Sequence, residues 1–130
     1  MRALIVDDSR AMRTILARML HGVGYEVFEA ENGQDGLEIL RSQSPLKLVL
    51  VDWNMPVMDG IDFIRAVRTE LGDRDLPIMM VTTESETNQV VRALAAGATE
   101  YLMKPFTESG LIEKLSILGA VPEPCGESGS

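Results

Sequence analysis

The stretch Ala3-Leu4-Ile5-Val6-Asp7-Asp8 places four apolar residues directly before two aspartates. An apolar run without alternation is typical of a strand that is buried on both faces of a parallel sheet. Two similar runs follow along the chain, at 46–51 before Asp52 and at 78–81 before Thr82. We therefore expect three buried parallel strands, each followed by a polar side chain.

Amphipathic stretches separate these apolar runs. The first begins after Ser9, a favoured N-cap residue, and ends at Gly22 or Gly24. Its apolar stripe is expected to contain Met12, Ile15, Leu16 and Met19. Further elements are expected as a half-buried strand at 26–30, a helix from Asn32 that Pro45 ends, helices at 62–70, 86–96 and 108–118, and a strand at 100–103.

The expected elements form a β-α unit repeated five times. Connections this short, with right-handed crossovers, predict an α/β fold with helices on both faces of a parallel sheet. We expect a (βα)5 doubly wound, five-stranded parallel sheet with the flavodoxin-like strand order 2-1-3-4-5. The expected domain covers residues 1–120, and residues 121–130, rich in Pro, Gly, Ser and Glu, are expected to form a disordered tail.

Composition narrows the classes of partner. The 130 residues include 12 Lys and Arg against 20 Asp and Glu, which gives a net charge of -8. This acidic balance argues against nucleic-acid binding and favours metal ions or basic protein surfaces. Cys125 is the only cysteine, so neither an internal disulfide nor a multi-cysteine metal site is expected. No apolar run has the length of a membrane span, and we expect a cytoplasmic monomer without membrane contact.

Polar side chains follow four of the expected strands. Asp7 and Asp8 follow the first, Asp52 the third, Thr82 the fourth and Lys104 the fifth. The carboxyl ends of parallel strands meet at one edge of the sheet, where such folds bind ligands. Three carboxylates that converge there would repel one another, and a hard divalent cation such as Mg²⁺ would relieve the repulsion. Simpler interpretations exist for most of these residues, since Asp7 and Asp8 could cap the following helix, Thr82 and Thr83 could cap the fourth helix and Lys104 could be a solvated surface lysine. Asp52, in contrast, has no helix to cap immediately.

Acids, a cation, a lysine and a hydroxyl together suit phosphoryl transfer, which needs mostly charge neutralisation and positioning. No Ser/His/Asp set is evident in the sequence, so a carboxylate would have to be the nucleophile.

The ordered set Asp7-Asp8, Asp52, Thr82-Thr83 and Lys104-Pro105-Phe106 resembles the receiver domain of bacterial two-component response regulators. The resemblance covers about residues 2–118. The segments 52–56, 58–60 and 101–106 are especially similar to those of single-domain, CheY-type chemotaxis regulators. The resemblance implies a phosphoprotein that catalyses its own phosphorylation and dephosphorylation and is not a turnover enzyme.

The resemblance also implies the roles of individual residues. Asp52 would accept a phosphoryl group from a phosphohistidine of a sensor histidine kinase. The ligands of the Mg²⁺ cofactor would be Asp7, Asp8, Asp52 and the backbone carbonyl of Asn54, with Asp7 acting partly through water. Lys104 and Thr82 would contact the phosphoryl oxygens, together with the backbone amides of Asn54 and Thr83.

Further implied roles concern the switch and the output. Tyr101 would act as the aromatic switch partner of Thr82, Asn54 and Glu84 would tune hydrolysis, and Lys104-Pro105 would be a cis peptide. The partner would bind the face of the fourth helix, fifth strand and fifth helix, at Val90, Leu94, Tyr101, Met103, Phe106 and Lys114. It would be the flagellar motor switch or, in a phosphorelay, a phosphotransfer protein with its own histidine.

Three other classes compete with this interpretation. A phosphatase of the haloacid dehalogenase class would need an aspartate two residues after Asp52, where the chain has Asn54. A flavodoxin would need a Ser/Thr/Gly-rich phosphate loop where the chain has Asp7-Asp8-Ser9-Arg10. A scaffold module would leave the converging acids unexplained. One departure from the receiver pattern is Thr83, where many receivers have alanine.

Overall fold

The structure, a computed structural model, describes residues 1–43, 46–52, 58–72, 75–82, 87–104 and 106–119, with the backbone alone at 87–90. Strands and helices alternate along these residues, as the sequence predicts. In chain order they are β1 (Arg2–Val6), α1 (Arg10–Val23), β2 (Glu26–Ala30), α2 (Gly33–Gln43), β3 (Leu48–Asp52), α3 (Gly60–Thr69), β4 (Ile78–Thr82), α4 (Thr87–Ala96), β5 (Glu100–Met103) and α5 (Glu108–Leu118).

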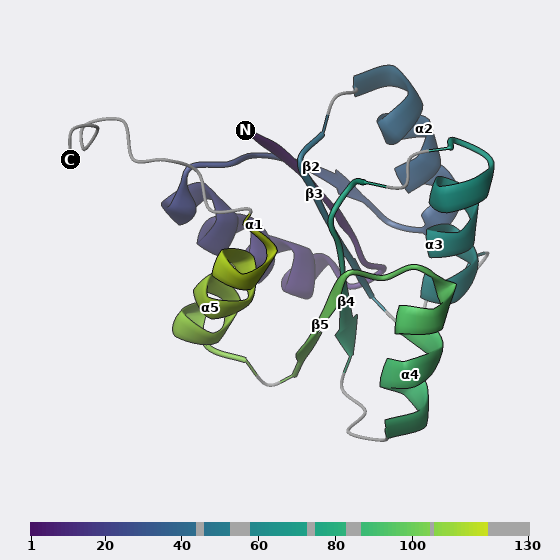
Figure 1. The fold of residues 1–130 in the computed structure, drawn as a ribbon. Helices are drawn as coiled ribbons and strands as arrows, with labels where there is room; N and C mark the ends of the chain where they lie inside the picture. The colour runs from purple at the N-terminus through teal and green to yellow at the C-terminus, as the bar shows by residue number, and fades with distance from the viewer. Residues whose placement is uncertain (44–45, 53–57, 73–74, 83–86, 105, 120–130) are drawn as a thin grey trace.

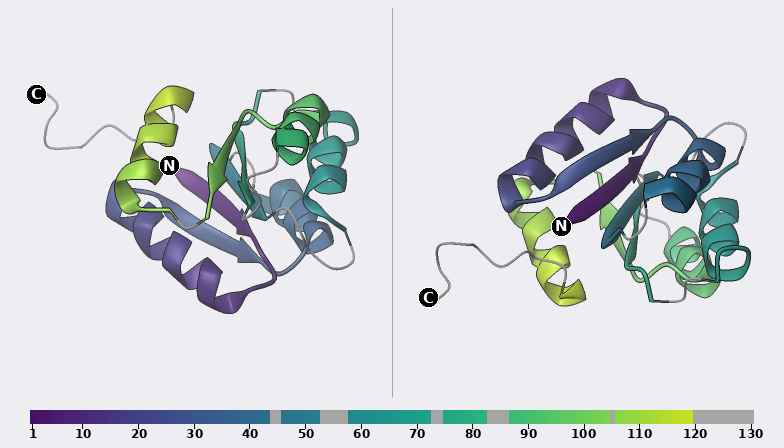
Figure 2. Two further views of the ribbon diagram at one scale, coloured as in Figure 1. Left: turned by 90° about the horizontal axis from the view of Figure 1, so that it is seen from below. Right: turned by 90° about the horizontal axis from the view of Figure 1, so that it is seen from above.

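The five strands form one parallel sheet in the order β2-β1-β3-β4-β5. Helices α1 and α5 cover one face of this sheet, and α2, α3 and α4 cover the other (Figures 1 and 2). The predicted fold class and strand order are therefore confirmed. The order reverses between β1 and β3, and the helices that follow these two strands lie on opposite faces.

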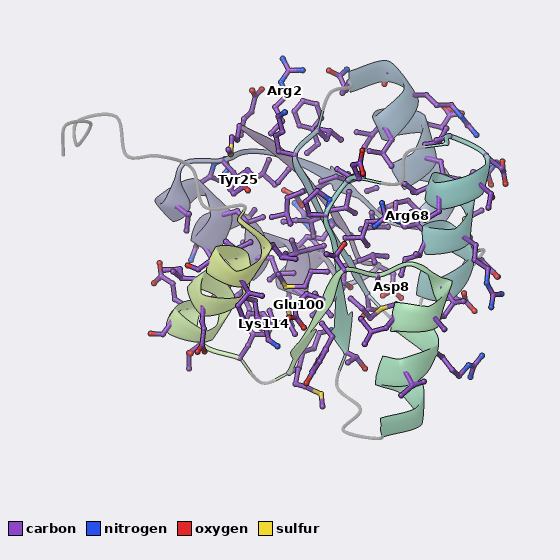
Figure 3. The ribbon with its side chains drawn as sticks, in the orientation of Figure 1. Arg2, Asp8, Tyr25, Arg68, Glu100 and Lys114 are labelled. Atoms are coloured by element: carbon purple, nitrogen blue, oxygen red, sulfur yellow. The ribbon has the colours of Figure 1, made fainter. Side chains whose placement is uncertain are left out.

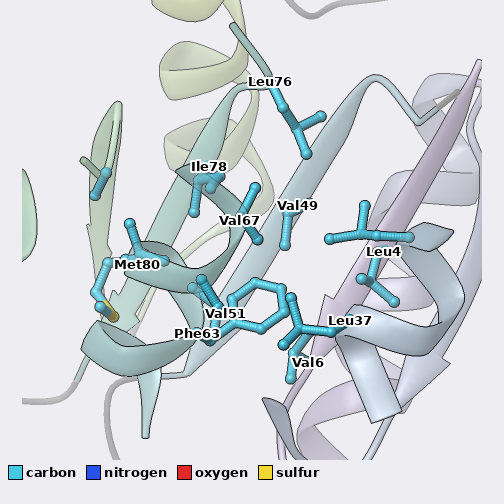
Figure 4. Packing of buried hydrophobic residues seen from close by; sticks show 14 of the residues in the cluster. Leu4, Val6, Leu37, Val49, Val51, Phe63, Val67, Leu76, Ile78 and Met80 are labelled. Atoms are coloured by element: carbon cyan, nitrogen blue, oxygen red, sulfur yellow. The ribbon is translucent and has the colours of Figure 1, made fainter. Parts of the chain in front are cut away.

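Two hydrophobic cores form because successive strand residues point to opposite faces of the sheet. Leu4, Val49 and Met80 belong to the core beneath α2, α3 and α4, where Phe63 is fully buried (Figure 4). Their neighbours along the strands, such as Ile5 and Leu50, belong to the core beneath α1 and α5. Burial on both faces explains why the central strands are apolar without alternation.

The capping residues act as the sequence predicts. The Ser9 hydroxyl accepts a hydrogen bond from the Met12 amide at 3.2 Å, and Gly24, with a φ of 112°, caps the C-terminal end of α1. The Thr107 hydroxyl accepts one from the Gly110 amide at 3.0 Å at the start of α5. These local bonds set the helix boundaries that the sequence pattern indicated.

Two boundaries differ from the prediction by two residues, and several others differ by one. Helix α3 begins at Gly60 rather than at residue 62, because the Asp59 carboxylate caps it by accepting a hydrogen bond from the Asp62 amide at 2.9 Å. Strand β3 begins at Leu48 rather than at residue 46.

The buried face of α1 also differs from the predicted apolar stripe. Ile15 is 45% exposed, whereas Arg13 is only 9% exposed and lies on the same face as Leu16 and Leu20. The face of α1 that packs against the sheet therefore includes Arg13, a residue that hydrophobicity alone would place in water. The partners of Arg13, described below, explain its burial.

No helix among the described ranges has the length and apolar character needed to cross a membrane.

Gly60 allows α3 to begin close against the end of β3. A Cβ at residue 60 would lie 2.6 Å from the backbone oxygen of Asp52. We expect Gly60→Ala to destabilise the protein by about 1–3 kcal/mol because the backbone must move. Gly22→Ala is the matched control, since its Cβ would be no closer than 3.7 Å to another residue. Urea unfolding would measure both, and equal stability of the two variants would contradict this prediction.

Candidate functional site

Polar side chains gather at the carboxyl edge of the sheet. Asp7 directly follows β1, Asp52 ends β3, Thr82 ends β4 and Lys104 directly follows β5. Neighbouring strand ends are in register, since Asp52 pairs with Val81 and Thr82 with Met103. The carboxylates come from β1 and β3, the two strands between which the order reverses, where parallel sheets form their ligand-binding crevice.

Lys104 connects strands that are distant in sequence. Its Nζ donates a hydrogen bond to Asp52 Oδ1 at 3.2 Å and lies 3.8 Å from Asp7 Oδ2. Its backbone amide donates to the Thr82 carbonyl at 2.7 Å, which continues the sheet pairing by one residue. The ammonium is thus held over two carboxylates and is not a solvated surface group.

Three carboxylates form a compact acidic cluster. Asp7, Asp8 and Asp52 each offer one oxygen, and these oxygens all lie within 4.8 Å of one another. Asp7 is 2% and Asp52 9% exposed, whereas Asp8 is exposed to solvent. Asp7 Oδ1 accepts a hydrogen bond from the Ser9 amide at 2.8 Å. Its Oδ2 is buried, and among the described residues no group donates a hydrogen bond to it.

Burial dominates the electrostatics of this cluster. Desolvation raises the pKa of Asp7, and the Ser9 amide and the Lys104 charge offset part of this effect. Desolvation also raises the pKa of Asp52, the negative charge of Asp7 raises it further, and Lys104 opposes both. The pKa values of both carboxylates therefore stay raised even with Lys104 in place.

The donor set fits a small divalent cation. Mg²⁺ prefers oxygen ligands, uses few carboxylates and keeps several waters. The three aspartates supply such oxygens from one side, and Asp7 Oδ2 needs a partner that the described residues do not provide as a hydrogen-bond donor. A cation at the exposed side of the cluster, near Asp8, would satisfy this atom.

A second group of polar residues lies on β5 and α5. Lys114 Nζ of α5 lies 3.2 Å from Glu100 Oε1 (Figure 3). The same Nζ is 4.2 Å from the centroid of the half-buried Tyr101 ring. The Tyr101 amide also donates to Glu100 Oε1 at 3.0 Å. These contacts hold Tyr101 between the core beneath α4 and the surface of α5.

Several predicted residues fall outside the described part of the chain. They are Asn54, Thr83, Glu84, Pro105 with the predicted cis peptide bond, the side chain of Val90, and the segment 121–130 predicted to be a tail. Of the other predicted residues on the partner-binding face, Leu94 is exposed, while Met103, Phe106 and Lys114 are half-buried. The structure thus brings Asp7, Asp8, Asp52 and Lys104 together and places Thr82 on the adjacent strand end.

Two residues next to the acidic cluster, Arg13 and Glu29, were not predicted from the sequence. Arg13 Nη1 donates to the backbone carbonyl of Asp7 at 2.7 Å, and its Nε donates to Glu29 Oε1 at 3.2 Å. The available signal was the helical spacing of Arg13 with Leu16 and Leu20, which places the arginine on the inward face of α1.

Comparison with known proteins identifies the family. The profile of the response regulator receiver domain matches residues 3–116. The chain belongs to this receiver domain family. The receiver is 43% identical over 119 residues to the chemotaxis protein CheY1 of Helicobacter pylori strain 26695, covering 91% of this chain and 96% of the relative. It is 41% identical over 116 residues to the chemotaxis protein CheY of Pseudomonas aeruginosa PAO1, covering 88% and 93%.

Solved structures agree with this assignment. A high-resolution structure of the Vibrio cholerae chemotaxis protein CheY4 superposes on the receiver with a TM-score of 0.84 at 35% identity, covering 90% of this chain and 97% of that one. The similarity extends over nearly the whole of each relative. The receiver is therefore a CheY-type response regulator of a two-component system, and it belongs to a group of signalling proteins.

Proposed function

We propose that this receiver accepts a phosphoryl group on Asp52 from a phosphohistidine of a sensor histidine kinase, in a Mg²⁺-dependent reaction. The observation that carries the proposal is the position of Asp52 Oδ1. This oxygen lies 3.2 Å from Lys104 Nζ, and Asp52 belongs to the acidic cluster with Asp7 and Asp8. A carboxylate nucleophile, a fixed ammonium and a cation site are the groups that phosphoryl transfer needs.

In this reaction an oxygen of Asp52 attacks phosphorus, and the bond from phosphorus to the histidine nitrogen breaks. The electron pair of that bond leaves with the imidazole, and Asp52 becomes an acyl phosphate. Lys104, held between Asp52 and Asp7, would then contact a phosphoryl oxygen, and the Thr82 hydroxyl would donate to another. Asp7, Asp8, Asp52 and the Asn54 carbonyl would hold Mg²⁺, which when bound neutralises charge on the phosphoryl oxygens.

The test of this proposal uses acetyl phosphate as a small phosphoryl donor. Intact mass spectrometry with Mg²⁺ should show the gain of one labile phosphoryl group, and reduction of the acyl phosphate with labelled borohydride should locate it at Asp52. Chelation of Mg²⁺ should prevent the gain. No gain when acetyl phosphate and Mg²⁺ are both present, or a label at another residue, would contradict the proposal. Multiple turnover without a stable adduct would instead indicate a phosphatase.

Mg²⁺ binding depends on Asp8 in this proposal. We expect Asp8→Asn to weaken Mg²⁺ binding at least about tenfold, since a hard cation loses one of few anionic ligands. Asp8 is exposed, so the substitution should leave the fold intact. The emission of Trp53, the only tryptophan, would report binding. Glu38→Gln, an exposed carboxylate on α2, is the control, and equal Mg²⁺ affinity of Asp8→Asn and wild type would show that the ligand assignment is wrong.

We further propose that the signal leaves through the face formed by α4, β5 and α5. Val91 and Leu94 of α4 are 55% and 43% exposed, and Lys114 Nζ of α5 lies 4.2 Å from the centroid of the half-buried Tyr101 ring on β5. Phosphorylation would draw the Thr82 hydroxyl toward Asp52 and vacate space for the Tyr101 ring. The relatives are named chemotaxis proteins, which favours the flagellar motor switch as the partner.

Tyr101→Ala tests this coupling. We expect it to weaken the binding of the purified flagellar motor switch protein from the same organism to the beryllofluoride-treated receiver several-fold, while the rate of phosphorylation changes little. Isothermal titration with and without beryllofluoride would give the ratio of the two affinities. An unchanged ratio, together with a lowered melting temperature, would mean that Tyr101 only stabilises the fold.

A further inference from the structure

Arg13 is a buried cation next to the acidic cluster. An arginine is rarely buried to this degree unless its donors are paired. Here Nε donates to Glu29 on the edge strand β2, and Nη1 donates to the Asp7 carbonyl at 2.7 Å. Arg13 therefore contacts the backbone of a cluster residue and not its carboxylate.

The Asp7 carbonyl belongs to the peptide group that joins Asp7 to Asp8. Because a peptide group is planar, a bond that fixes the Asp7 oxygen also fixes the Asp8 nitrogen and Cα. The Asp7 amide is held separately, since it donates to the Ala30 carbonyl at 3.1 Å. Arg13 thus restrains the plane from which the exposed Asp8 side chain projects, and Asp8 has no buried surroundings to restrain it.

We propose that Arg13, braced by Glu29, is a positioning residue that sets the direction of Asp8 and thereby the geometry of the cation site. This inference rests on the proposed function, because it assumes that the acidic cluster binds Mg²⁺. Partners that orient metal ligands typically change metal affinity about 10–100-fold when they are removed.

Removal of Arg13 should change cation affinity in opposite directions, depending on whether Arg13 acts through its charge or by positioning Asp8. If Arg13 acted only through its charge, its removal would strengthen cation binding, since a positive group next to the site would be lost. If it positions Asp8, its removal weakens binding. The weakening should be larger for Mg²⁺, which requires nearly octahedral ligands, than for Ca²⁺, which tolerates irregular ones. A general loss of stability would affect both ions alike.

The experiment measures the dissociation constants of Mg²⁺ and Ca²⁺ by isothermal titration for wild type, Arg13→Met and Arg13→Lys. Arg10→Met is the matched control, since Arg10 is an exposed arginine at the start of the same helix. We expect Arg13→Met to weaken Mg²⁺ binding about tenfold or more and to lower the preference for Mg²⁺ over Ca²⁺. Arg13→Lys should keep only part of the wild-type affinity for Mg²⁺, because a single ammonium lacks the forked set of donors with which the guanidinium reaches both partners. Arg10→Met should bind Mg²⁺ as wild type or slightly more tightly.

Glu29→Ala provides a second variant in case Arg13→Met does not fold. Glu29 is half-exposed, so its loss removes the brace without opening the core. Glu29→Ala should lower the preference for Mg²⁺ over Ca²⁺. Glu29→Gln should leave this preference unchanged, because the glutamine still offers an acceptor for Arg13 Nε. Tighter or unchanged Mg²⁺ binding in Arg13→Met, or an equal loss for both ions, would overturn the inference. Absence of Mg²⁺ binding by the wild type would instead overturn the proposed function.

Discussion

Asp52→Asn is expected to take up no phosphoryl group from acetyl phosphate and Mg²⁺. The acceptor must be an anionic oxygen, and an asparagine amide offers a neutral one that is a far weaker nucleophile. Its carbonyl oxygen can still accept the Lys104 hydrogen bond, so the fold should be preserved. Intact mass spectrometry over a time course would measure the loss, which we expect to be at least about a thousandfold in rate.

A matched control separates this effect from a change in total charge. Asp62→Asn also removes one negative charge, but Asp62 is exposed on α3 and lies outside the acidic cluster. Its uptake of phosphoryl groups should equal that of wild type. A mass gain in Asp52→Asn that maps to Asp7 or Asp8 would show that another member of the cluster is the acceptor.

Most of the fold could be predicted because its determinants are local. The apolar runs of β1, β3 and β4 and the caps at Ser9 and Thr107 lie within the segments that they define. The gathering of Asp7, Asp52 and Lys104 could also be predicted, because parallel strands deliver their carboxyl ends to one edge. Once the strand assignment was correct, the site followed from the topology.

Other features depend on contacts between distant segments. Arg13 is buried because Asp7 and Glu29 offer acceptors, and nothing in the amphipathic pattern of α1 indicates these partners. The contact of Lys114 with Glu100 likewise depends on how α5 packs on β5. Hydrophobicity alone placed Ile15 inward. The spacing of Arg13 with Leu16 and Leu20 was compatible with an inward arginine, but only the two acceptors explain why Arg13 is buried and Ile15 is not.

The acidic cluster should make the metal-free protein less stable at neutral pH. Burial raises the pKa values of Asp7 and Asp52, so the folded state favours their protonated forms more than the unfolded state does. Their contribution to stability is therefore fully present below the unfolded-state pKa and is lost as the pH rises through the raised folded-state pKa values. Above that window both carboxylates are charged, and the desolvation penalty and mutual repulsion remain.

We therefore expect Asp7→Asn to raise the melting temperature in metal-free buffer at neutral pH. The asparagine Oδ1 can keep the hydrogen bond from the Ser9 amide, while the buried charge is removed. Each kcal/mol of relieved penalty should raise the melting temperature by about 4 °C in a domain of this size. Asp52→Asn should give a smaller gain, because it removes the carboxylate that is closer to Lys104, at 3.2 Å compared with 3.8 Å for Asp7, and that accepts its hydrogen bond.

Differential scanning calorimetry across the pH range, with and without Mg²⁺, tests this expectation. The difference between Asp7→Asn and wild type should decrease toward acid pH, where the wild-type carboxylates are protonated. It should also decrease in Mg²⁺, because a cation that binds only the folded state stabilises the wild type. Glu38→Gln, an exposed carboxylate, should change stability by less than about 0.5 kcal/mol at any pH. A lower melting temperature for Asp7→Asn in metal-free buffer would mean that Lys104 and the Ser9 amide already compensate the buried charge, and that the cluster has no unmet need for a cation.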